Sequence, residues 1–572
     1  MATEAPSNAP YYLLNFERAL AWVAERYDDL LNVREHGFLL AFAALPQASR
    51  ALLVRMLMRK GTLFRASRLA YDEIGCPVQA SAPLVDLGWV DAEPPLTLDD
   101  LFALTTRPEL LVIFADAIAL IPGARGLRKP DLLETLRPFY EAEGDAARPL
   151  AAWHAASTDS VLHVVIAPLC ERLRLMFFGN LHQDWSEFVL ADLGVFQYET
   201  VAFGPSSRAF QQRADVDVYL ALHACREALE WLSDGESIGE LVAAVAAIET
   251  SNPWLETRRA KLLFRIGQHC ERQHNWQGAL AVYAECAWPG ARHRRIRVLE
   301  RCERFDDAFA LASQAAAAPE SEEEAQRIAR MLPRLQRRRG EPVARTPAAR
   351  PVERSTLVLP RPEAAQPVEF VARDHLNRED APVHYVENAL INSLFGLLCW
   401  EPVFAALPGA FFHPFQRGPA DLHAPDFYSR RAAQFAACLA QLDSTVYRET
   451  ILRHLETKAG LQSPFVFWGV LTPELIASAL DCLPAAHLKL CFERLLRDIR
   501  SNRSGLPDLI RFWPAERRYE LIEVKGPGDR LQDNQIRWLA YCAQHGMPVR
   551  VLDVRWADEA DTGPEAAQEA AA

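Results

Sequence analysis

Three side chains near the C-terminal end could together hold a metal ion and activate water. Asp508 leads the short apolar stretch 508–513, and Glu523 and Lys525 belong to an alternating stretch, YELIEVK, that follows a turn. Two such stretches joined by a short turn predict a β-hairpin, which brings Asp508 close to Glu523. Because successive side chains of a strand point to opposite faces, Glu523 and Lys525 share one face. The sequence therefore predicts two carboxylates and one ammonium group at the end of a sheet.

Such a trio suits the hydrolysis of phosphodiester bonds. Two neighbouring carboxylates repel each other, and a divalent cation bound between their oxygens removes that cost. The cation polarises a phosphate and lowers the pKa of a bound water, while a lysine orients the water or stabilises the developing charge. The arrangement matches the PD-(D/E)xK pattern of nucleases, although an edge hairpin with a surface ion pair accounts for the same residues. The nuclease interpretation is favoured because Lys525 is one of only six lysines in the chain.

The segment after the hairpin predicts the remaining elements of such a site. Residues 526–556 indicate a loop, a helix that ends near Gly546, and a further strand. In that helix Gln535 and Trp538 are neighbours at helical spacing, and we expect Trp538 to pack beneath the site. The order strand–strand–helix–strand is typical of a restriction-endonuclease-like α/β core.

The rest of the chain is predicted to be largely helical. The stretches 11–27 and 49–61 repeat apolar residues at helical intervals. Residues 97–141 contain two helical stretches around a Gly-Pro break, which is typical of a SAP-type DNA-binding module or of an ordinary helical hairpin. Residues 147–335 are predicted to be helical throughout, with two segments of tetratricopeptide-like (TPR-like) spacing. The fold class is therefore predicted as multidomain and mainly α, with one C-terminal α/β domain.

Composition shifts divide the 572 residues into several parts. A proline- and arginine-rich linker precedes the C-terminal domain, and an acidic, alanine-rich tail, predicted to be disordered, follows it. The predicted parts are an N-terminal helical DNA-binding region (1–75), a SAP-like DNA-binding region (76–146), a TPR-like helical scaffold (147–335), the linker (336–368), a nuclease domain (369–556) and the tail (557–572).

The charge of the chain excludes a protein that coats polyanions without selection. The net charge is −13, yet 56 of the 62 basic residues are arginine and they cluster at 292–304, 327–354 and 494–518. Solvated helix faces and a GC-rich codon bias account for such clusters, as do local contacts with nucleic acid.

Several other protein classes find no support in the sequence. No run of about 18 uninterrupted apolar residues predicts a membrane span, and MATEAPSNAP lacks the pattern of a secretory signal. Eleven cysteines without a CxxC spacing favour reduced thiols in a cytoplasm. A Walker A sequence is absent, which argues against ATP-driven translocation. We therefore expect a cytoplasmic, nucleoid-associated protein with neither a membrane nor ATP as a partner.

The motifs resemble those of the Fanconi-associated nuclease family. The run GLPDLIRFWP…YELIEVKGPGDRLQDNQIRWL resembles the VRR-NUC domain of that family. Three further runs, YYLLNFERALAWVAERYDDLL, MRKGTLFRASRLAYDEIG and DFYSRRAAQFAACLAQL, are similar to other parts of it, so the resemblance extends over nearly the whole chain. The ubiquitin-binding zinc finger of the family is absent, as suits a bacterial form, and recruitment through ubiquitin is not implied.

The resemblance implies a metal site with three acidic side chains. Glu387, Asp508, Glu523 and the main-chain carbonyl of Val524 would bind two ions of Mg²⁺ or Mn²⁺, and Lys525 would assist the water. We expect Glu387 to begin an amphipathic helix. A glutamate in a first turn usually complements the helix dipole, but the resemblance gives Glu387 the place of the family's helical metal ligand.

The resemblance also implies a basic pocket for a DNA 5′-phosphate, between the nuclease domain and the helical scaffold. Arg500 falls on a pocket arginine of the family, and Arg503 lies beside it. Arg292 or Arg297 could form the other wall. Asn534 stands where the family has a basic residue, which puts that one contact in doubt.

The function implied by the resemblance is that of a metal-dependent, structure-specific DNA nuclease. It would cut 5′ flaps and digest DNA from 5′ ends in steps, in the repair of interstrand crosslinks. Its DNA would be a 5′-flapped, branched or crosslinked duplex, with Arg128 and Lys129 of the SAP-like region as candidates for phosphate contacts and Gln535 in a supporting role. Two alternatives remain: a resolvase of four-way Holliday junctions, and a DNA-binding repair scaffold without catalytic activity.

Overall fold

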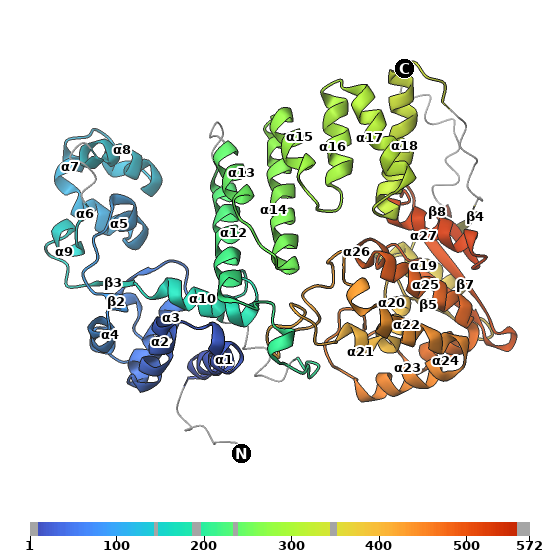
Figure 1. Cartoon of the computed structure of the whole chain (residues 1–572), viewed down its shortest axis with the longest axis horizontal. Coiled ribbons are helices and arrows are strands. Elements are labelled where there is room, and N and C mark those ends of the chain that lie inside the picture. Colours follow the sequence, from blue (N-terminus) through green and yellow to red (C-terminus); the bar gives the residue numbers. More distant parts are fainter. Residues whose placement is uncertain (1–9, 142–146, 186–195, 233–237, 344–351, 558–572) are drawn as a thin grey trace. The chain divides into compact units, whose positions relative to one another are not determined.

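In the computed structural model, shown in Figure 1, the protein forms two compact units. One unit contains residues 1–195 and 210–216, and the other contains residues 196–209 and 217–572. The described part is mainly helical with one C-terminal α/β domain, which confirms the predicted fold class. Most of the predicted tail, residues 558–572, lies outside the described residues. The structure describes residues 10–141, 147–185, 196–232, 238–343 and 352–557.

The first unit begins with helices that pack around aromatic side chains. Phe16 contacts Phe42 and Trp185, with ring centroids 5.3 and 4.8 Å apart. A small antiparallel sheet of order β1-β3-β2 adjoins these helices. Strand β3 corrects the prediction of continuous helix after residue 147, because Val161 and Val164 are buried β-branched residues that favour a strand. The elements are α1 (Tyr11–Tyr27), α2 (Val33–Ala44), α3 (Gln47–Leu57), β1 (Leu63–Arg65), α4 (Pro77–Asp86), β2 (Val90–Asp91), β3 (Val161–Val164) and α10 (Ala167–Phe178).

The SAP-like region of the same unit is a set of short helices with its own core. Thr97 accepts from the Asp100 N–H while Asp100 accepts from the Thr97 N–H, so this pair caps α5. Leu101, Phe102 and Phe114 are buried between the helices. The helices are α5 (Leu98–Leu104), α6 (Arg107–Ile113), α7 (Ala115–Ala119), α8 (Lys129–Glu141) and α9 (Leu150–Trp153).

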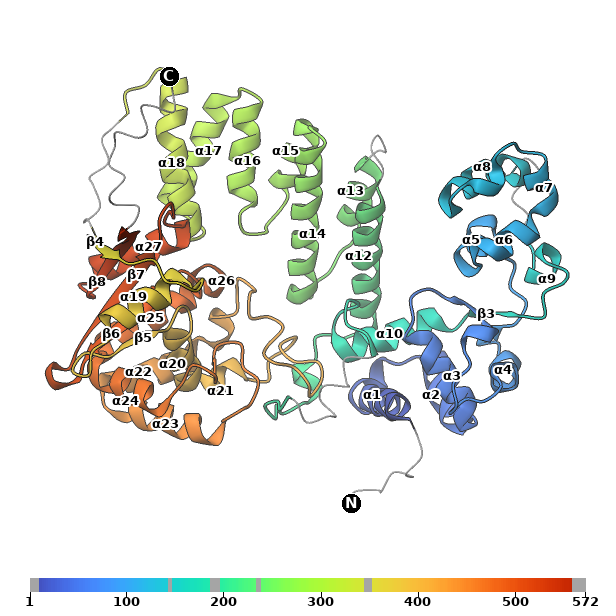
Figure 2. The ribbon, with the colours of Figure 1, turned by 180° about the vertical axis from the view of Figure 1, so that it is seen from behind.

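The helical scaffold of the second unit stacks antiparallel helix pairs, and Figure 2 shows α14 to α18 side by side from behind. Close packing of α14 on α15 depends on Gly267, because a Cβ there would lie 2.4 Å from Cε1 of Tyr283. The helices are α12 (Arg213–Trp231), which begins in the first unit, α13 (Ile238–Ala246), α14 (Pro253–Arg272), α15 (Trp276–Ala284), α16 (Ala291–Arg301), α17 (Phe305–Ala317) and α18 (Glu322–Arg338).

The C-terminal domain is built on a five-stranded sheet of order β4-β8-β7-β6-β5. Strands β5, β6 and β7 pair antiparallel, whereas β8 pairs parallel with both β7 and β4. The predicted strand–strand–helix–strand order is confirmed as β6-β7-α27-β8. The elements are β4 (Glu353–Leu359), α19 (Val368–Leu376), β5 (Val383–Tyr385), α20 (Leu390–Leu398), α21 (Trp400–Val403), α22 (Ala432–Ala440), α23 (Val446–Thr457), α24 (Pro473–Cys482), α25 (Ala485–Arg497), α26 (Ile499–Asn502), β6 (Leu509–Trp513), β7 (Arg518–Lys525), α27 (Asp533–Gln544) and β8 (Val549–Trp556).

Both faces of this sheet are covered. Ile510 and Leu521 pack in a large core with helices α20 to α25 and with Trp538 of α27. Leu509 and Ile522 pack on the opposite face, in a smaller core with α19. Strand pairing and two cores therefore fix the hairpin that carries the predicted acidic residues.

Strand β4 lies within the segment 336–368 that the sequence predicted as a linker. Its residues 353–359 pair in parallel with β8, and Arg354 forms an ion pair with Asp553. The alternation of Leu357 and Leu359 with exposed neighbours explains the strand. The linker prediction therefore needs correction at β4.

No single helix of the described residues is long and apolar enough to cross a membrane. Helices α24 and α25, bent by 105° at their junction, meet the length and composition criteria only as a pair. The side chains of Leu480 and Phe492 on these helices are buried in the large core.

We expect the second unit to lose stability in acid partly through His413. Burial lowers the pKa of His413 to about 3, so the unfolded chain gains a proton near the ordinary histidine pKa of about 6.5 while the folded chain stays neutral. The folded state is therefore destabilised as the pH falls below about 6.5, by roughly 2 kcal/mol at pH 5. Denaturant unfolding at pH 7.5 and pH 5 checks this: the loss of stability should be smaller in His413→Gln, and an equal loss would contradict the prediction.

Candidate active site

The β6-β7 hairpin brings the predicted acidic residues together. Leu509 pairs with Ile522, which places Asp508 opposite Glu523 on the same face of the sheet. All three predicted side chains are buried: Asp508 is 5% exposed, Glu523 0% and Lys525 8%. The trio is therefore held at the sheet end in a largely water-free setting.

One hydrogen bond and one ion pair hold the trio. The Val524 N–H donates to Asp508 Oδ2 at 2.8 Å, and Lys525 Nζ forms an ion pair with Glu523 Oε1 at 2.7 Å. Within the described residues both oxygens of Glu523 are buried without a hydrogen-bond donor. A buried carboxylate oxygen with no donor, beside a second carboxylate, is suited to a hard divalent cation.

The pKa shifts of Asp508 and Glu523 also favour a bound cation. Burial raises the pKa of Asp508, and the charges of Glu369 and Glu387 raise it further. The hydrogen bond from the Val524 N–H and the charge of Lys525 lower this pKa but do not cancel the increase. Burial and then the charge of Asp508 raise the pKa of Glu523, against the effect of Lys525. Negative charge is therefore crowded at this site, and a bound cation would relieve the crowding.

Glu387 lies beside the hairpin but not in a helix. The Val386 N–H donates to the main-chain oxygen of Asp508 at 2.8 Å, so the strand pairing continues to this point. Asn388 has a positive φ of 51°, and α20 starts only at Leu390. The expectation that Glu387 begins the helix was wrong, because this left-handed residue separates the strand from the helix.

Both oxygens of Glu387 already have donors. The Tyr385 hydroxyl donates to Oε2, and the Asn388 amide donates to Oε1 at 3.2 Å. Among the described residues no three His, Cys, Asp or Glu side chains are close enough to surround an ion as they stand. The three-carboxylate site thus stays a prediction, and binding by Glu387 would require it to turn away from Tyr385.

The sequence analysis missed Glu369, in the first turn of α19. Its charge acts on Asp508, and Phe370 next to it packs against Tyr385 with ring centroids 4.9 Å apart. The sequence contains no local signal for Glu369, because the packing of α19 on the sheet alone brings it close.

A tight loop, residues 503–507, leads into Asp508 and is called the approach loop below. Gly505 has a φ of +88°, and a Cβ there would lie 2.7 Å from the main-chain carbon of Asn534. The Leu506 N–H donates to Asn388 Oδ1 at 3.1 Å. Only glycine fits the conformation and the contact at 505, so the loop locks Asp508 against α27 and against the Glu387 turn.

A large cavity lies in the same unit, between the helical scaffold and the C-terminal domain. It has a volume of about 1080 Å³ and is lined by scaffold residues including His293 and Arg294 and by Arg497, Arg500 and Arg537 of the C-terminal domain. Burial lowers the pKa of His293 to about 4, and the nearby arginines Arg327 and Arg297 add to the effect. The lining carries six Arg or Lys side chains and six carboxylates, so the cavity beside the loop 503–507 offers basic groups within a mixed-charge wall.

Arg500 is the one predicted pocket arginine that lines this cavity. Desolvation and the charges of Arg265, Arg258 and Arg500 lower the pKa of Lys261 on α14. Lys261 and Arg265 were missed by the sequence analysis, since a helix of mixed charge gives no sign of which face meets another domain.

Two of the other three predicted pocket arginines are held by protein groups. Arg503 donates to the main-chain oxygen of Pro464 at 2.6 Å. Arg292 donates to both oxygens of Glu324, at 2.5 and 2.9 Å. Arg297 is not among the residues that line the cavity, and its charge acts on the buried His293.

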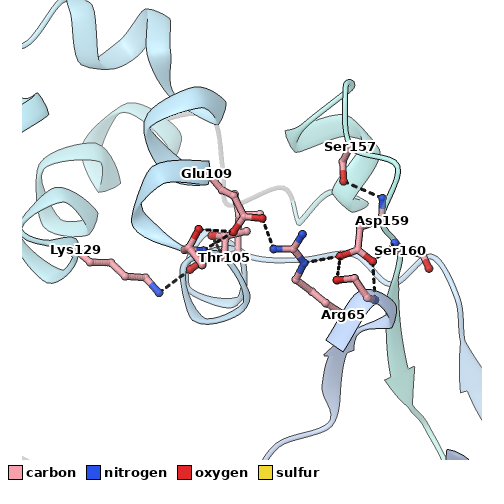
Figure 3. Close-up of polar contacts among 10 residues, drawn as sticks. Arg65, Thr105, Glu109, Lys129, Ser157, Asp159 and Ser160 are labelled. Carbon is pink, nitrogen blue, oxygen red and sulfur yellow. Dashed lines mark hydrogen bonds and ion pairs between the residues drawn. The ribbon is translucent and has the colours of Figure 1, made fainter. Parts of the chain in front are cut away.

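Arg128 and Lys129, the two candidates for phosphate contacts in the SAP-like region, have different surroundings. The side chain of Arg128 is 90% exposed, with Asp131 at 3.3 Å. Lys129 Nζ donates to the main-chain oxygen of Thr105 at 2.8 Å, at the end of α5, as Figure 3 shows. The same view shows Arg65 between Glu109 and Asp159, which ties the SAP-like region to β1.

Two residues of α27 hold the start of that helix and the end of α26. Trp538 is 1% exposed and donates from Nε1 to the main-chain oxygen of Asn502 at 2.9 Å. Gln535 accepts from the Gln532 N–H at 2.8 Å and caps the start of α27. Trp538 therefore packs beneath α26, as expected of a residue under the site.

Three family models match parts of the chain. A VRR-NUC domain matches residues 443–556, an HTH domain of the type described as FAN1 matches residues 10–91, and a Fanconi anemia-associated nuclease SAP domain matches residues 95–153. The hairpin and α27 lie inside the first match, and α5 to α8 lie inside the third.

Relatives and solved structures match almost the full chain. A Fanconi-associated nuclease 1 homolog of Pseudomonas aeruginosa is 55% identical over 96% of this chain and 98% of the relative. A homolog of Arabidopsis thaliana is 24% identical over 96% of this chain and 67% of its own length. A crystal structure described as paFAN1 bound to 2nt 5′flap DNA with gap has a TM-score of 0.86, 55% identity and coverage of 96% of this chain and 99% of that chain.

Proposed function

This chain belongs to the Fanconi-associated nuclease family and is a structure-specific DNA nuclease, and we propose that it cuts 5′ flaps and digests DNA from 5′ ends in interstrand crosslink repair. The observation that carries the proposal is the buried Asp508–Glu523–Lys525 trio beside a cavity whose lining includes Arg500. The bacterial relative's crystal structure with a 5′-flap DNA supports it. The natural setting would be the nucleoid in the cytoplasm.

Nucleases with a VRR-NUC domain use divalent metal ions. We assign Mg²⁺ or Mn²⁺, as two ions, to Asp508, Glu523, Glu387 and the Val524 carbonyl. Bound there, the ions would polarise the scissile phosphate and lower the pKa of the attacking water. Asp508 and Glu523 would supply the oxygens, and the hydrogen bond from the Val524 N–H keeps Asp508 oriented.

Lys525 would then position the water or stabilise the charge that develops on the phosphate. Its ammonium is 2.7 Å from Glu523 Oε1 and is largely shielded from solvent. A buried compact cation is suited to a charge that appears only in the transition state, because the low local dielectric strengthens the interaction.

The 5′ end of the flap would enter the cavity. Arg500 lines it, and the charges of Arg500 and Arg265 act on Lys261. Several cations around one phosphate fix position without reading the base sequence. Arg128 of the exposed SAP-like surface would contact the duplex.

We expect Arg500→Ala to reduce the preference for a 5′-phosphate. With Mg²⁺ present, cleavage of a labelled flap that ends in phosphate should fall about tenfold, and cleavage of the same flap ending in hydroxyl should change little, because one charged hydrogen bond is lost. Chelation of the cation should stop both reactions. Arg378→Ala, an arginine of the same domain outside the cavity, is the control. Equal losses on both substrates would contradict the assignment.

A further inference from the structure

A buried arginine joins the helical scaffold to the segment that carries Arg500. Arg494 of α25 is 1% exposed. Its Nη2 donates to Glu322 Oε2 in the first turn of α18 at 2.6 Å, and its Nη1 donates to the main-chain oxygen of Arg537 at 2.9 Å. One side chain of α25 therefore contacts both α18 of the scaffold and α27 of the nuclease domain.

The same arginine organises the start of the approach loop. Its guanidinium lies over the rings of Trp538 and Tyr541, 4.4 and 4.3 Å from their centroids. The main-chain oxygen of Arg494 accepts from Asn502 Nδ2 at 2.9 Å, and Asn502 in turn accepts from Trp538. Asn502 is the last residue of α26, which carries Arg500, so the position of α26 depends on this network.

Further contacts between α18 and α27 are more exposed. Arg330 pairs with Asp533 at 2.6 Å, but the two side chains are 53% and 49% exposed. Arg537 donates to Gln326 at 2.7 Å. Exposed pairs contribute little, whereas Arg494 is buried and its charge needs a partner. The Arg494–Glu322 pair, with the two side chains 1% and 33% exposed, is therefore the better buried of the two ion pairs that join α18 to the nuclease domain.

These contacts form a continuous path from the cavity to the hairpin. Helix α18 contributes Glu323 and Arg327 to the cavity wall, and α26 contributes Arg500. The loop 503–507, closed against α27 at Gly505, then runs directly to Asp508. A shift of α18 relative to α25 would change the path from the cavity to the carboxylates.

We propose that the Arg494–Glu322 pair is a positioning device that sets how far from the 5′ end the strand is cut. The inference rests on the proposed function, because it requires a 5′ end held in the cavity. The length of strand that spans the distance from the cavity to the carboxylates then sets the position of the incision. Misplacement of a phosphate by about 1 Å can lower its rate of cleavage by about 10²-fold, which reduces its advantage over neighbouring phosphates.

The test compares incision positions in Glu322→Ala, Glu322→Gln and Glu300→Ala. Glu322→Ala removes the acceptor of Arg494, and Glu322→Gln removes the charge but keeps an acceptor oxygen. Glu300 pairs with Arg334 inside the scaffold, so its variant loses an ion pair of α18 without touching the nuclease domain. A 5′-phosphorylated flap, labelled at its 3′ end, is cut under single-turnover conditions and the products are resolved to the nucleotide.

We expect the share of the main product to fall about threefold in Glu322→Ala, with neighbouring positions gaining. Glu300→Ala should keep the wild-type pattern, and Glu322→Gln should lie between it and Glu322→Ala, because the acceptor oxygen remains while the charge is lost; thermal unfolding shows that each variant is folded. A uniform loss of all products in Glu322→Ala, or an unchanged pattern, would overturn the inference. A wild-type enzyme whose cuts are the same with a terminal phosphate or hydroxyl would instead overturn the proposed 5′-end pocket, and with it this inference.

Discussion

We expect Asp508→Asn to lower the rate of metal-dependent flap cleavage on the order of 10³-fold, because a carboxylate ligand worth several kcal/mol is lost. Asparagine has the same size and keeps an oxygen for the Val524 N–H, which lies 2.8 Å from Asp508 Oδ2 in the wild type. The hairpin should therefore persist, and flap binding measured in the presence of chelator should be unchanged. Single-turnover cleavage of a labelled flap measures the effect.

The thermal stability of Asp508→Asn should be maintained or increased, although its cleavage rate falls. Asp508 and Glu523 are buried on one face and raise each other's cost of ionisation. Without a cation, removal of one charge relieves repulsion, so Asp508→Asn should melt at the same or a higher temperature than the wild type. Glu516→Gln, an acid-to-amide change at the exposed hairpin turn, is the control and should leave activity and stability unchanged. Equal cleavage by Asp508→Asn and the wild type would refute a catalytic role.

The parts of the site that the sequence predicts are those set by short-range order. The turn after Trp513 and the alternation of YELIEVK place Asp508 opposite Glu523, and the structure has this register. The helix after the hairpin ends at Gln544, close to the predicted end. Local patterns were sufficient here because a hairpin and the next helix are built from neighbouring segments.

The parts that the sequence misses depend on contacts between distant segments. Glu387 precedes its helix because Asn388 takes a left-handed conformation and Val386 pairs with Asp508. Glu369 comes close to the acids only because α19 packs on the sheet. Such placements follow from tertiary packing, which outweighs local preference.

Tertiary packing also decides which arginines line the cavity and which bind protein oxygens. Arg292 and Arg503 belong to the basic runs that suggested a pocket, yet each satisfies a protein oxygen. Arg500 lines the cavity. Arginine clusters in a sequence therefore indicate where charge is abundant, but which guanidinium faces a ligand depends on the acids and carbonyls that folding brings near.

Lys525→Met is the second variant with a large expected effect. We expect single-turnover cleavage to fall on the order of 10²-fold, because methionine keeps the volume of the buried stem but removes the ammonium group. Lys525→Arg should not restore the rate, since a planar guanidinium does not fit the place of a compact cation that is 2.7 Å from Glu523 Oε1. Rate measurements at saturating Mg²⁺ on a phosphorylated flap check both variants.

The affinity for metal distinguishes the catalytic interpretation from a structural one. Loss of a cation next to two carboxylates makes the site more negative, so Lys525→Met should bind Mn²⁺ as tightly as the wild type or more tightly in calorimetry. Lys458→Met is the matched control, because Lys458 also pairs with a glutamate, Glu199 at 2.7 Å, away from the hairpin. That variant should lose stability but keep its rate per folded molecule. If Lys525→Met lost metal binding together with its rate, Lys525 would be a structural support of the site and would not act in the reaction itself.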